Sequence, residues 1–375
     1  MAEFCDLRGD VRVNGKASTI FTVLEAQSAS GSFSWSIRPY GRRIDNFAMS
    51  VAREWHIKLV SDGAGQCTQN YTVPGILFSV GSYAGNHFHA FTDVLVPLFA
   101  AARPFNGKVV LLVTDYHRNP DWVGKFGALL QGLSVYEPIN IDSDEQTTVH
   151  CFPSILIGPK HRSEKELSLS RAGTPYKITD FTAFLRDRYS LKRLTAIKLK
   201  EEGDERRPRL LIVSRQQSRR FLNVDDIQAM AADVGFDVIV KEPGANMSEI
   251  AAEINSCDVL LGVHGAGLTN LVFLPENAVF VQIVPMGGAE WVSSTFFGQP
   301  SKEMKLRYVE YKIQLDESSL KDQYNPDDIV LRNPQAVKDK GWQVFKQVYF
   351  DQQNININIT RFRPTLMEVM ELLRK

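Results

Sequence analysis

Short apolar runs alternate with amphipathic stretches between residues 210 and 284. Runs of this length are typical of buried strands, and the stretches between them have the period of helices. The predicted elements are strand 210–214, a helix from 223 or 225 to 234, strand 236–240, helix 248–255, strand 258–263, helix 267–274 and strand 278–284. Because strands and helices alternate across short loops, the second half of the chain is predicted to be a doubly wound, Rossmann-like α/β unit.

The first half repeats this alternation less regularly. Residues 73–80 and 109–115 are predicted to be buried strands, with a helix over about 85–103 between them. Residues 9–60 have the pattern of short strands joined by turns, and a hairpin is predicted at Asn14-Gly15. The expected architecture is α/β, with two Rossmann-like domains that face a ligand cleft.

The chain has 375 residues, which is enough for two domains that each have their own core. Residues 198–209 hold nine charged residues, one Gly and one Pro, and this composition is typical of a linker. We therefore expect a first domain over residues 1–205 and a second over 206–358. Residues 359–375 are expected to form a helix that packs back on the body, because apolar residues recur there at helical spacing: Leu366, Val369, Met370 and Leu373.

The balance of charge excludes two classes of partner. The 43 Lys and Arg residues equal the 43 Asp and Glu residues, so the chain has no long-range field to hold nucleic acid or an anionic membrane surface. No apolar run is long enough to span a membrane, and the N-terminal sequence lacks the form of a signal peptide. Three Asn-x-Ser/Thr sequons, at Asn70, Asn246 and Asn358, point to the secretory pathway, so any anchor is expected outside this sequence.

The cysteines form no CxxC pair, which argues against a zinc cluster or a thioredoxin-like motif. Cys5 and Cys67 lie in polar N-terminal sequence and are candidates for a disulfide. Cys257 opens an apolar run and is expected to be a buried free thiol. The fourth cysteine is Cys151, and the connectivity stays open.

The strongest local signal is a strand that ends in His264-Gly265-Ala266-Gly267 and is followed at once by a helix. Small residues let a ligand approach the backbone closely, and the free amides at a helix start suit a diphosphate. The motif is neither GxGxxG nor GxxxxGK[ST], so a nicotinamide cofactor and a P-loop hydrolase are excluded. The alternative interpretation is a tight corner with His264 packed in the core.

A group of arginines follows the first strand of the same unit. Arg215 lies just past residues 210–214, and Arg219 and Arg220 come one turn later. Guanidinium groups at this edge of a sheet can pair with phosphate oxygens, although such a run is also typical of a solvated face. Glu242, at the end of strand 236–240, is a candidate ligand for ribose hydroxyls.

The helix predicted in the first half places Asn86, His89 and Asp93 on one face, since their spacings are three and four. His89 and Asp93 can move a proton, the carboxylate acting either directly as the base or as the group that orients the imidazole. His87 points elsewhere, toward a ligand or the core. Pro97 is expected to bend or end this helix. A capped helix start with only internal hydrogen bonds is the alternative.

One metal motif is present but lacks its context. Asp142-Ser-Asp144 has the DxD form with which many sugar transferases hold a divalent ion, yet no glycine loop is near it. It is predicted to be a solvated turn, and no metal site is expected. Ser/His/Asp and Cys/His hydrolase arrangements also lack their local motifs.

Four segments in one order resemble the plant branch of glycosyltransferase family 61: GNHFHAFTDVLVPLF, VHCFPSILIGPKH, RPRLLIVSRQQSRRFLN and CDVLLGVHGAGLTNLVFLP. The resemblance runs from about Asp6 to the C-terminus and is closest to the grass enzymes that add xylose or arabinose to xylan. It implies a GT-B fold, inversion at the anomeric carbon, and no metal or other cofactor. It also implies the luminal catalytic part of a Golgi type II membrane protein whose anchor is absent from this sequence.

The resemblance assigns roles to the residues above. It implies a UDP-sugar held in the second domain, with the Gly265, Ala266 and Gly267 amides and Arg215 at the diphosphate, and with Arg219, Arg220, Glu242 and His264 nearby. It implies xylan or a xylo-oligosaccharide in the first domain, with Asp93 as the first candidate base, His89 as the second, and Asn86 and His87 as acceptor contacts. Trp291 and Phe296, with Phe297, are candidates for stacking on sugar rings or for packing between the domains.

The expected activity is β-1,2-xylosyl transfer from UDP-xylose to the xylan backbone. The alternatives are α-1,3-arabinofuranosyl transfer from UDP-arabinofuranose, N-acetylglucosaminyl transfer to a protein, and a noncatalytic homologue that only binds carbohydrate. Nothing in the residues separates the two pentoses.

Overall fold

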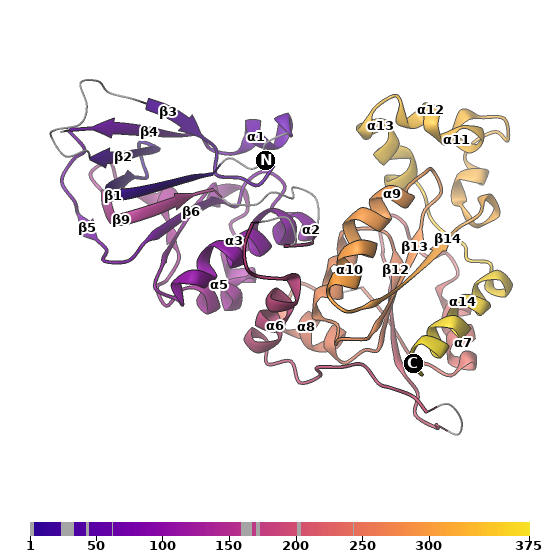
Figure 1. Ribbon diagram of the computed structural model, residues 1–375. Coiled ribbons are helices and arrows are strands. Elements are labelled where there is room, and N and C mark those ends of the chain that lie inside the picture. Colours follow the sequence, from indigo (N-terminus) through magenta and orange to yellow (C-terminus); the bar gives the residue numbers. More distant parts are fainter. Residues whose placement is uncertain are drawn as a thin grey trace. The chain divides into compact units, whose positions relative to one another are not determined.

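The computed structural model describes residues 4–23, 34–42, 45–61, 63–158, 167–169, 173–200, 204–242 and 244–375. The chain divides into two compact units, Met1–Phe181 and Thr182–Lys375. The division falls inside helix α6 (Ile178–Arg188), ahead of the boundary after residue 205 that the charged stretch suggests. Each unit contains a β-sheet with helices packed on it, so the protein is of the mixed α/β class (Figure 1).

The sheet of the first unit has the strand order β3-β4-β2-β1-β9-β6-β7-β8, with β5 beside β9. Its strands are β1 (Cys5–Asn14), β2 (Thr19–Val23), β3 (Ser34–Ile37), β4 (Trp55–Val60), β5 (Gln69–Asn70), β6 (Gly75–Ser79), β7 (Val110–Thr114), β8 (Ile139–Asn140) and β9 (His150–Ile157). Strands β9, β6, β7 and β8 run parallel, whereas β1 is antiparallel to both β2 and β9. The first unit is therefore Rossmann-like only in its parallel part.

The antiparallel part begins with the hairpin that the sequence predicts. Asn14 pairs with Thr19 across the turn, and the Asn14 side chain accepts a hydrogen bond from the Ala17 amide at 2.8 Å. Gly15 is required here, since a Cβ would lie 2.1 Å from the carbonyl oxygen of Ile141. A turn this short leaves no room for a crossover helix, which is why β1 and β2 are antiparallel.

The helices of the first unit are mostly short. They are α1 (Asn46–Val51), α2 (His87–His89), the π-helix η1 (Ala90–Leu95), α3 (Val96–Ala102), α4 (Trp122–Lys125), α5 (Gly127–Leu133) and the 3₁₀ turns η2 (Arg103–Phe105), η3 (Tyr116–Arg118) and η4 (Ile141–Ser143). The segment from α2 to α3 is continuous, so the helix does not end at Pro97. Pro97 is the second residue of α3 and lies directly after the π-helical segment, where the regular pattern of helical hydrogen bonds is already interrupted.

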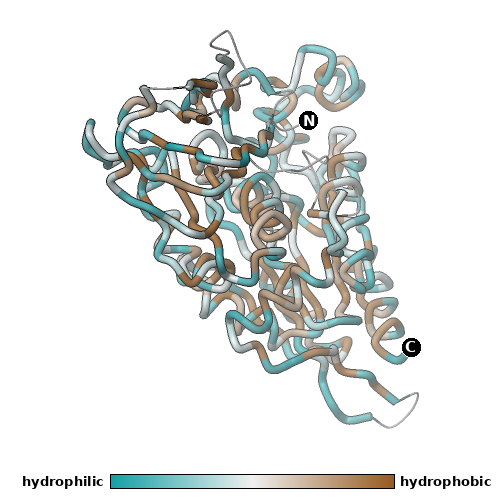
Figure 2. Tube along the Cα trace, turned by 60° about the vertical axis from the view of Figure 1, so that its left-hand side comes forward, coloured by the Kyte–Doolittle hydropathy of each residue, from teal (hydrophilic) through white to brown (hydrophobic). Residues whose placement is uncertain are grey.

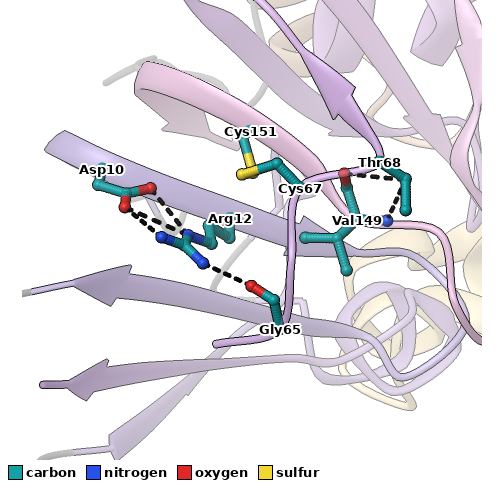
Figure 3. The surroundings of a disulfide bond; sticks show 7 residues. All are labelled: Asp10, Arg12, Gly65, Cys67, Thr68, Val149 and Cys151. Carbon is teal, nitrogen blue, oxygen red and sulfur yellow. Dashed lines mark hydrogen bonds and ion pairs between the residues drawn. A yellow bond between two sulfur atoms is a disulfide. The ribbon is translucent and has the colours of Figure 1, made fainter. Parts of the chain in front are cut away.

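A disulfide joins Cys67 to Cys151, 84 residues apart, beside the pairing of β5 with β9 (Figure 3). The candidate disulfide between Cys5 and Cys67 does not form. In the antiparallel pairing of β1 with β9, Cys5 lies opposite Ile157, at the other end of β9 from Cys151. Cys5 is a free thiol, and Cys257 is a buried free thiol, as its apolar context predicts.

The sheet of the second unit has five parallel strands in the order β11-β10-β12-β13-β14. They are β10 (Arg209–Val213), β11 (Asp237–Lys241), β12 (Val259–Val263), β13 (Val279–Val284) and β14 (Arg307–Lys312). The first four confirm the prediction, whereas β14 was missed because its sequence, RYVEYK, alternates charged and aromatic residues instead of forming an apolar run. The strand order reverses between β10 and β12. The carboxyl ends of these two strands are therefore the topological switch point of the sheet.

The second unit has helices on both faces of this sheet and others beyond the ends of its strands (Figure 1). They are α7 (Val224–Val234), α8 (Met247–Asn255), the 3₁₀ helix η5 (Ala266–Phe273), α9 (Glu290–Ser293), the π-helix η6 (Ser294–Gly298), α10 (Gln299–Glu303), η7 (Leu315–Glu317), η8 (Ser319–Asp322), α11 (Ile329–Arg332), α12 (Pro334–Lys338), α13 (Trp342–Lys346), the π-helix η9 (Gln347–Asp351) and α14 (Ile359–Leu372). Helices α9 and α10 lie on one face, and α7 and α14 on the other (Figure 1). This arrangement confirms the doubly wound fold predicted for the unit.

The C-terminal helix α14 packs on the second unit, as predicted. Its buried residues are Phe362, Leu366, Val369 and Met370. Polar and apolar residues alternate along it in Figure 2, which is the pattern of a helix with one face buried. Among the helices of the described ranges, none combines the length and the apolar character that crossing a bilayer requires.

Candidate active site

The two signals of the second unit meet at the switch point. Arg215 follows β10 and His264 follows β12, and these strands pair in parallel up to Val213 and Gly262. Both segments therefore leave the sheet at its carboxyl edge, where ligands of such sheets bind. The expectation that the glycine motif and the arginines lie together is confirmed.

Gly265 is the point at which the arginines touch the glycine motif. Its φ angle is 156°, and a Cβ on it would lie 2.9 Å from Nη1 of Arg215 and 2.9 Å from Nη1 of Arg219. Gly267 is different, since a Cβ there would meet only Val213, at 3.8 Å. Ala266 begins η5, whose first amides have no acceptor within the helix and face the same edge. Gly265 is thus the glycine that the packing of the two guanidinium groups requires.

Arg215 and Arg219 form a half-buried pair of positive charges. Nη1 of Arg219 donates to the carbonyl oxygen of His264 at 2.9 Å, and Nε of Arg215 donates to the carbonyl oxygen of Ser218 at 2.9 Å. Burial, followed by the charge of Arg215, lowers the pKa of Arg219 to about 10. Burial also lowers the pKa of Arg215, against the opposing charge of Glu242. Both groups stay protonated at neutral pH, so an anion that neutralises them relieves their mutual repulsion.

Arg220 and Glu242 lie at the margin of this pair. The Arg220 side chain is exposed, and its backbone amide donates to Oδ1 of Asn354 at 3.0 Å. Glu242 is exposed directly after β11 and forms no ion pair within 4 Å in the described part of the chain. Of the three predicted arginines, the structure brings Arg215 and Arg219 together with His264.

His264 is 5% exposed and is held by a chain of polar side chains. Nε2 of Gln282 donates to its Nδ1 at 2.9 Å, and Oε1 of Gln282 accepts a hydrogen bond from the Tyr308 hydroxyl at 2.9 Å. Burial, with the charges of Arg219 and Arg215, lowers the pKa of His264 to about 3. The ring is therefore neutral, and with Nδ1 as the acceptor its proton is on Nε2. Gln282 and Tyr308 were not predicted, because they come from β13 and β14 and no local motif marks them.

The aromatic candidates of the second unit separate into buried and exposed residues. Phe297 is buried, and its ring meets the ring of His264 edge to face, with centroids 5.4 Å apart. Phe296 is partly buried and packs against a hydrophobic cluster of this unit. Trp291, on α9, is 42% exposed and contacts the Lys338 ammonium. Only Trp291 retains an exposed face that a sugar ring can contact.

Asp93 and His89 are neighbours in the first unit, as their spacing predicts. Nδ1 of His89 lies 3.1 Å from Oδ2 of Asp93. The same oxygen accepts hydrogen bonds from the Tyr40 hydroxyl and from Nε of Arg42, both at 2.7 Å, and Oδ1 accepts one from Thr92 at 2.8 Å. Asp93 is 3% exposed, so its carboxylate is enclosed by four donors.

These donors keep Asp93 ionised. Burial by itself raises the pKa of Asp93, but the hydrogen bond from His89 and the charge of Arg42 outweigh it, and the net pKa is below the ordinary 3.8. A carboxylate in this state holds an imidazole in one orientation better than it accepts a proton. With Nδ1 directed at Asp93, the basic nitrogen available to a ligand is Nε2 of His89, whose side chain is 23% exposed.

Tyr40 and Arg42 were missed because no local pattern marks them. They flank Gly41, where a Cβ would lie 2.7 Å from the carbonyl oxygen of Asp93. The absence of a side chain at Gly41 lets this segment lie against the helix, so that both neighbours reach the carboxylate. Asn86 caps the helix, its Oδ1 accepting from the Phe88 amide at 3.0 Å.

His87 lies beside the core rather than beside His89. Its ring meets the ring of Phe91 edge to face, with centroids 5.1 Å apart. The other face of the cluster is aromatic, since the ring of Tyr83 stacks on that of His89 at 4.9 Å. The structure therefore brings His89 and Asp93 together with Tyr40 and Arg42, and leaves His87 outside that group.

Asp142 and Asp144 are bonded to the protein instead of forming a solvated turn, so that prediction is wrong. Oδ1 of Asp142 accepts from Nη1 of Arg53 at 2.5 Å, and Oδ2 accepts from the Tyr116 amide at 2.9 Å. Asp144 lies 3.1 Å from Nε2 of His150. These partners come from the segment before β4, from the turn after β7 and from β9. Within the described ranges, no three His, Cys, Asp or Glu side chains cluster closely enough to hold a metal ion.

Comparison with known proteins agrees with this architecture. The family model of glycosyltransferase 61 matches residues 87–281. This range contains His89 and Asp93 of the first unit. It also contains Arg215, Arg219 and His264 of the second unit. The chain is 41% identical over 374 residues to alpha-1,3-arabinosyltransferase XAT3 of Oryza sativa subsp. japonica, covering 99% of this chain and 64% of that protein. It is also 41% identical over 379 residues to beta-1,2-xylosyltransferase XAX1 of the same plant, covering 99% of this chain and 65% of that protein.

A further rice relative is matched over more of its own length. The chain is 36% identical over 388 residues to beta-1,2-xylosyltransferase XYXT1 of Oryza sativa subsp. japonica, covering 100% of this chain and 83% of that protein. By contrast, the chain spans less than two thirds of the length of the two relatives named above. The family model covers more than half of the sequence and the relatives match nearly all of it, and we conclude that the chain belongs to glycosyltransferase family 61.

Proposed function

We propose that this protein transfers a pentose from a UDP-sugar to the xylan backbone, with inversion at the anomeric carbon and with the two-domain GT-B arrangement. The observation that carries the donor half is the packing of Arg215 and Arg219 against Gly265 at the switch point of the second sheet. Two half-buried cations beside the backbone at the start of η5 fit the charge of a nucleoside diphosphate.

The donor's leaving group is stabilised by these groups. As the bond between the anomeric carbon and the diphosphate breaks, its electron pair passes to UDP. Arg215 and Arg219 neutralise that charge, and the neutral His264 donates a hydrogen bond from Nε2. This arrangement supplies the charge stabilisation for which other transferases use a metal ion, and we therefore propose a metal-independent reaction.

The acceptor half is assigned to the first unit, with His89 as the base and Asp93 as its positioning residue. The residue pattern alone favours Asp93 as the base, but a carboxylate with four donors and a lowered pKa is a weak proton acceptor. Nε2 of His89 takes the proton of an acceptor hydroxyl, whose oxygen attacks the anomeric carbon as UDP departs. Asp93 stabilises the imidazolium that forms.

Two pentoses, xylose and arabinofuranose, are candidates for the transferred sugar. Relatives named as beta-1,2-xylosyltransferase and as alpha-1,3-arabinosyltransferase match this chain at the same 41% identity. We put xylosyl transfer from UDP-xylose first and arabinofuranosyl transfer from UDP-arabinofuranose second.

The Golgi lumen is the proposed compartment, with a membrane anchor outside this sequence. A disulfide between Cys67 and Cys151 is compatible with an oxidising secretory compartment. The sequons at Asn70, Asn246 and Asn358 support the same assignment.

The test is release of UDP in the presence of xylo-oligosaccharide with UDP-xylose, UDP-arabinofuranose or UDP-N-acetylglucosamine, each with EDTA and with manganese. Acceptor-dependent release from one pentose donor in EDTA is the expected result, and NMR of the product gives the linkage and anomeric configuration. Release only with manganese contradicts metal independence. Binding of UDP without turnover on any acceptor favours a noncatalytic homologue.

A further inference from the structure

An aromatic row extends from His89 toward the surface of the first unit. The ring of Tyr83 stacks on His89 with centroids 4.9 Å apart and an interplanar angle of 29°. The ring of Phe47 stacks on Tyr83 with centroids 5.8 Å apart and the same angle. Phe47, Tyr83 and His89 therefore follow one another as three stacked rings, each inclined by 29° to the next.

Phe47 differs from the other members of the row in its exposure. It is 64% exposed, the largest exposed fraction of any phenylalanine in the described ranges, on the short helix α1. A single exposed apolar residue is ordinary on a protein surface. Phe47 differs from an ordinary one because its ring is held by stacking on Tyr83, which itself contacts the proposed base.

Polar groups border the same row. The Tyr83 hydroxyl lies 3.5 Å from Oδ1 of Asp45, and the Arg42 guanidinium lies over the Tyr83 ring at 5.9 Å from its centroid. Arg42 also binds Asp93. A flat apolar face bordered by a carboxylate, a hydroxyl and a guanidinium matches a xylose unit, whose ring faces are formed by C–H groups and whose hydroxyl groups lie around the rim.

We propose that Phe47 is an acceptor subsite: one sugar unit of the xylan chain stacks on the face of Phe47 away from Tyr83, while a unit further along the chain presents its hydroxyl to His89. This inference rests on the proposed function, since it takes xylan as the acceptor and His89 as the base. It adds a binding residue that lies outside residues 87–281, the part of the chain that matches the family model. The subsite holds the acceptor chain and takes no part in proton transfer.

The test compares Phe47→Ala and Phe47→Trp with the unchanged protein on a long and a minimal acceptor. For xylohexaose, Phe47→Ala is expected to raise KM about tenfold with kcat and UDP affinity unchanged, because one stacking contact is lost. Phe47→Trp is expected to keep or lower this KM. With methyl β-xyloside, which fills only the reacting position, Phe47→Ala is expected to leave KM unchanged.

Tyr136→Ala is the matched control, since Tyr136 is an exposed aromatic residue of the same unit. It precedes β8 and so lies at the amino edge of the parallel strands, away from the edge at which β6 leads into α2. Its KM for xylohexaose is expected to be unchanged. Thermal unfolding of each variant checks that the fold is retained.

Two results overturn the inference in different ways. An unchanged KM for xylohexaose in an active, folded Phe47→Ala protein removes Phe47 from the acceptor site and leaves the proposed function intact. If calorimetry shows that the unchanged protein binds no xylohexaose in the presence of UDP, and no transfer occurs, both the subsite and the proposed function fail.

Discussion

Nδ1 of His89 lies 3.1 Å from Oδ2 of Asp93, one helical turn away, and the same oxygen binds Tyr40 and Arg42. The relationship orients the imidazole and fixes which of its nitrogens faces away from the protein. It is also the basis of the roles proposed here, in which the ionised carboxylate stabilises a positive ring while Nε2 accepts a proton. The predictions for the first unit follow from this geometry.

His89→Ala is expected to lower kcat by about a hundredfold or more, the scale for loss of a positioned base, without changing UDP affinity. Asp93→Asn is expected to lower kcat less, and the double variant is expected to be no worse than His89→Ala, because the two residues act as one unit. Steady-state kinetics and calorimetry with UDP measure these effects. His56→Ala, at an exposed histidine bonded to Ser36, is the control. A larger loss in Asp93→Asn than in His89→Ala would return the base role to Asp93.

Arg215→Ala and Arg219→Ala are each expected to weaken UDP binding by about 1.5 to 3 kcal/mol, the range for a hydrogen bond to a charged group. The measurement is isothermal titration calorimetry with UDP. Arg220→Ala is the matched control, because the Arg220 side chain is exposed and only its backbone is bonded in the described structure. If all three variants bind UDP with the affinity of the unchanged protein, the donor site lies elsewhere.

Gly265→Ala is expected to weaken UDP binding about tenfold or more, since its Cβ would lie 2.9 Å from both guanidinium groups and the backbone there has a φ of 156°. Gly267→Ala is expected to have little effect, because its Cβ would meet only Val213, at 3.8 Å. Comparing the two by calorimetry separates a steric requirement from a general preference for small residues. Similar affinities in the two variants contradict the close packing at Gly265.

The lowered pKa of Asp93 makes part of the stability depend on pH. An acid whose folded pKa is lowered binds protons more readily when unfolded, so its contribution is complete above the ordinary value of 3.8 and is lost as the pH falls through the lower folded value. The difference in unfolding free energy between the unchanged protein and Asp93→Asn is therefore expected to be constant above about pH 5 and to shrink below about pH 4. Urea unfolding at a series of pH values measures it, and a difference that grows on acidification has the wrong sign.

Removing the disulfide with the double change Cys67→Ala and Cys151→Ala is expected to lower the unfolding free energy by about 4 to 5 kcal/mol, because the bond closes a loop of 84 residues. Thermal and urea unfolding measure the loss, and a reducing agent is expected to destabilise the unchanged protein similarly. Cys257→Ala is the control, since Cys257 is a free thiol. Equal stability of the double variant and the unchanged protein rules out the disulfide as a stabilising link.

The sequence determined whatever depends on residues that are close along the chain. Hydrophobic period identified four strands of the second sheet and the helices between them, and it placed His89 near Asp93 because a helix brings residues four apart onto one face. The meeting of Arg215 with His264 was also predictable, since parallel strands end at one edge.

Tertiary structure alone decided the contacts between distant segments. The antiparallel pairing of β1 with β9 separates Cys5 from Cys67. Cys151, at the other end of β9, lies beside Cys67 and forms the disulfide. Close approach at Gly41 brings Tyr40 and Arg42 to Asp93, and these contacts are the reason why we propose Asp93 as a positioning residue instead of the base. These outcomes depend on which strands pair and which surfaces pack, and such choices arise from burial summed over a whole unit, which no local pattern of residues records.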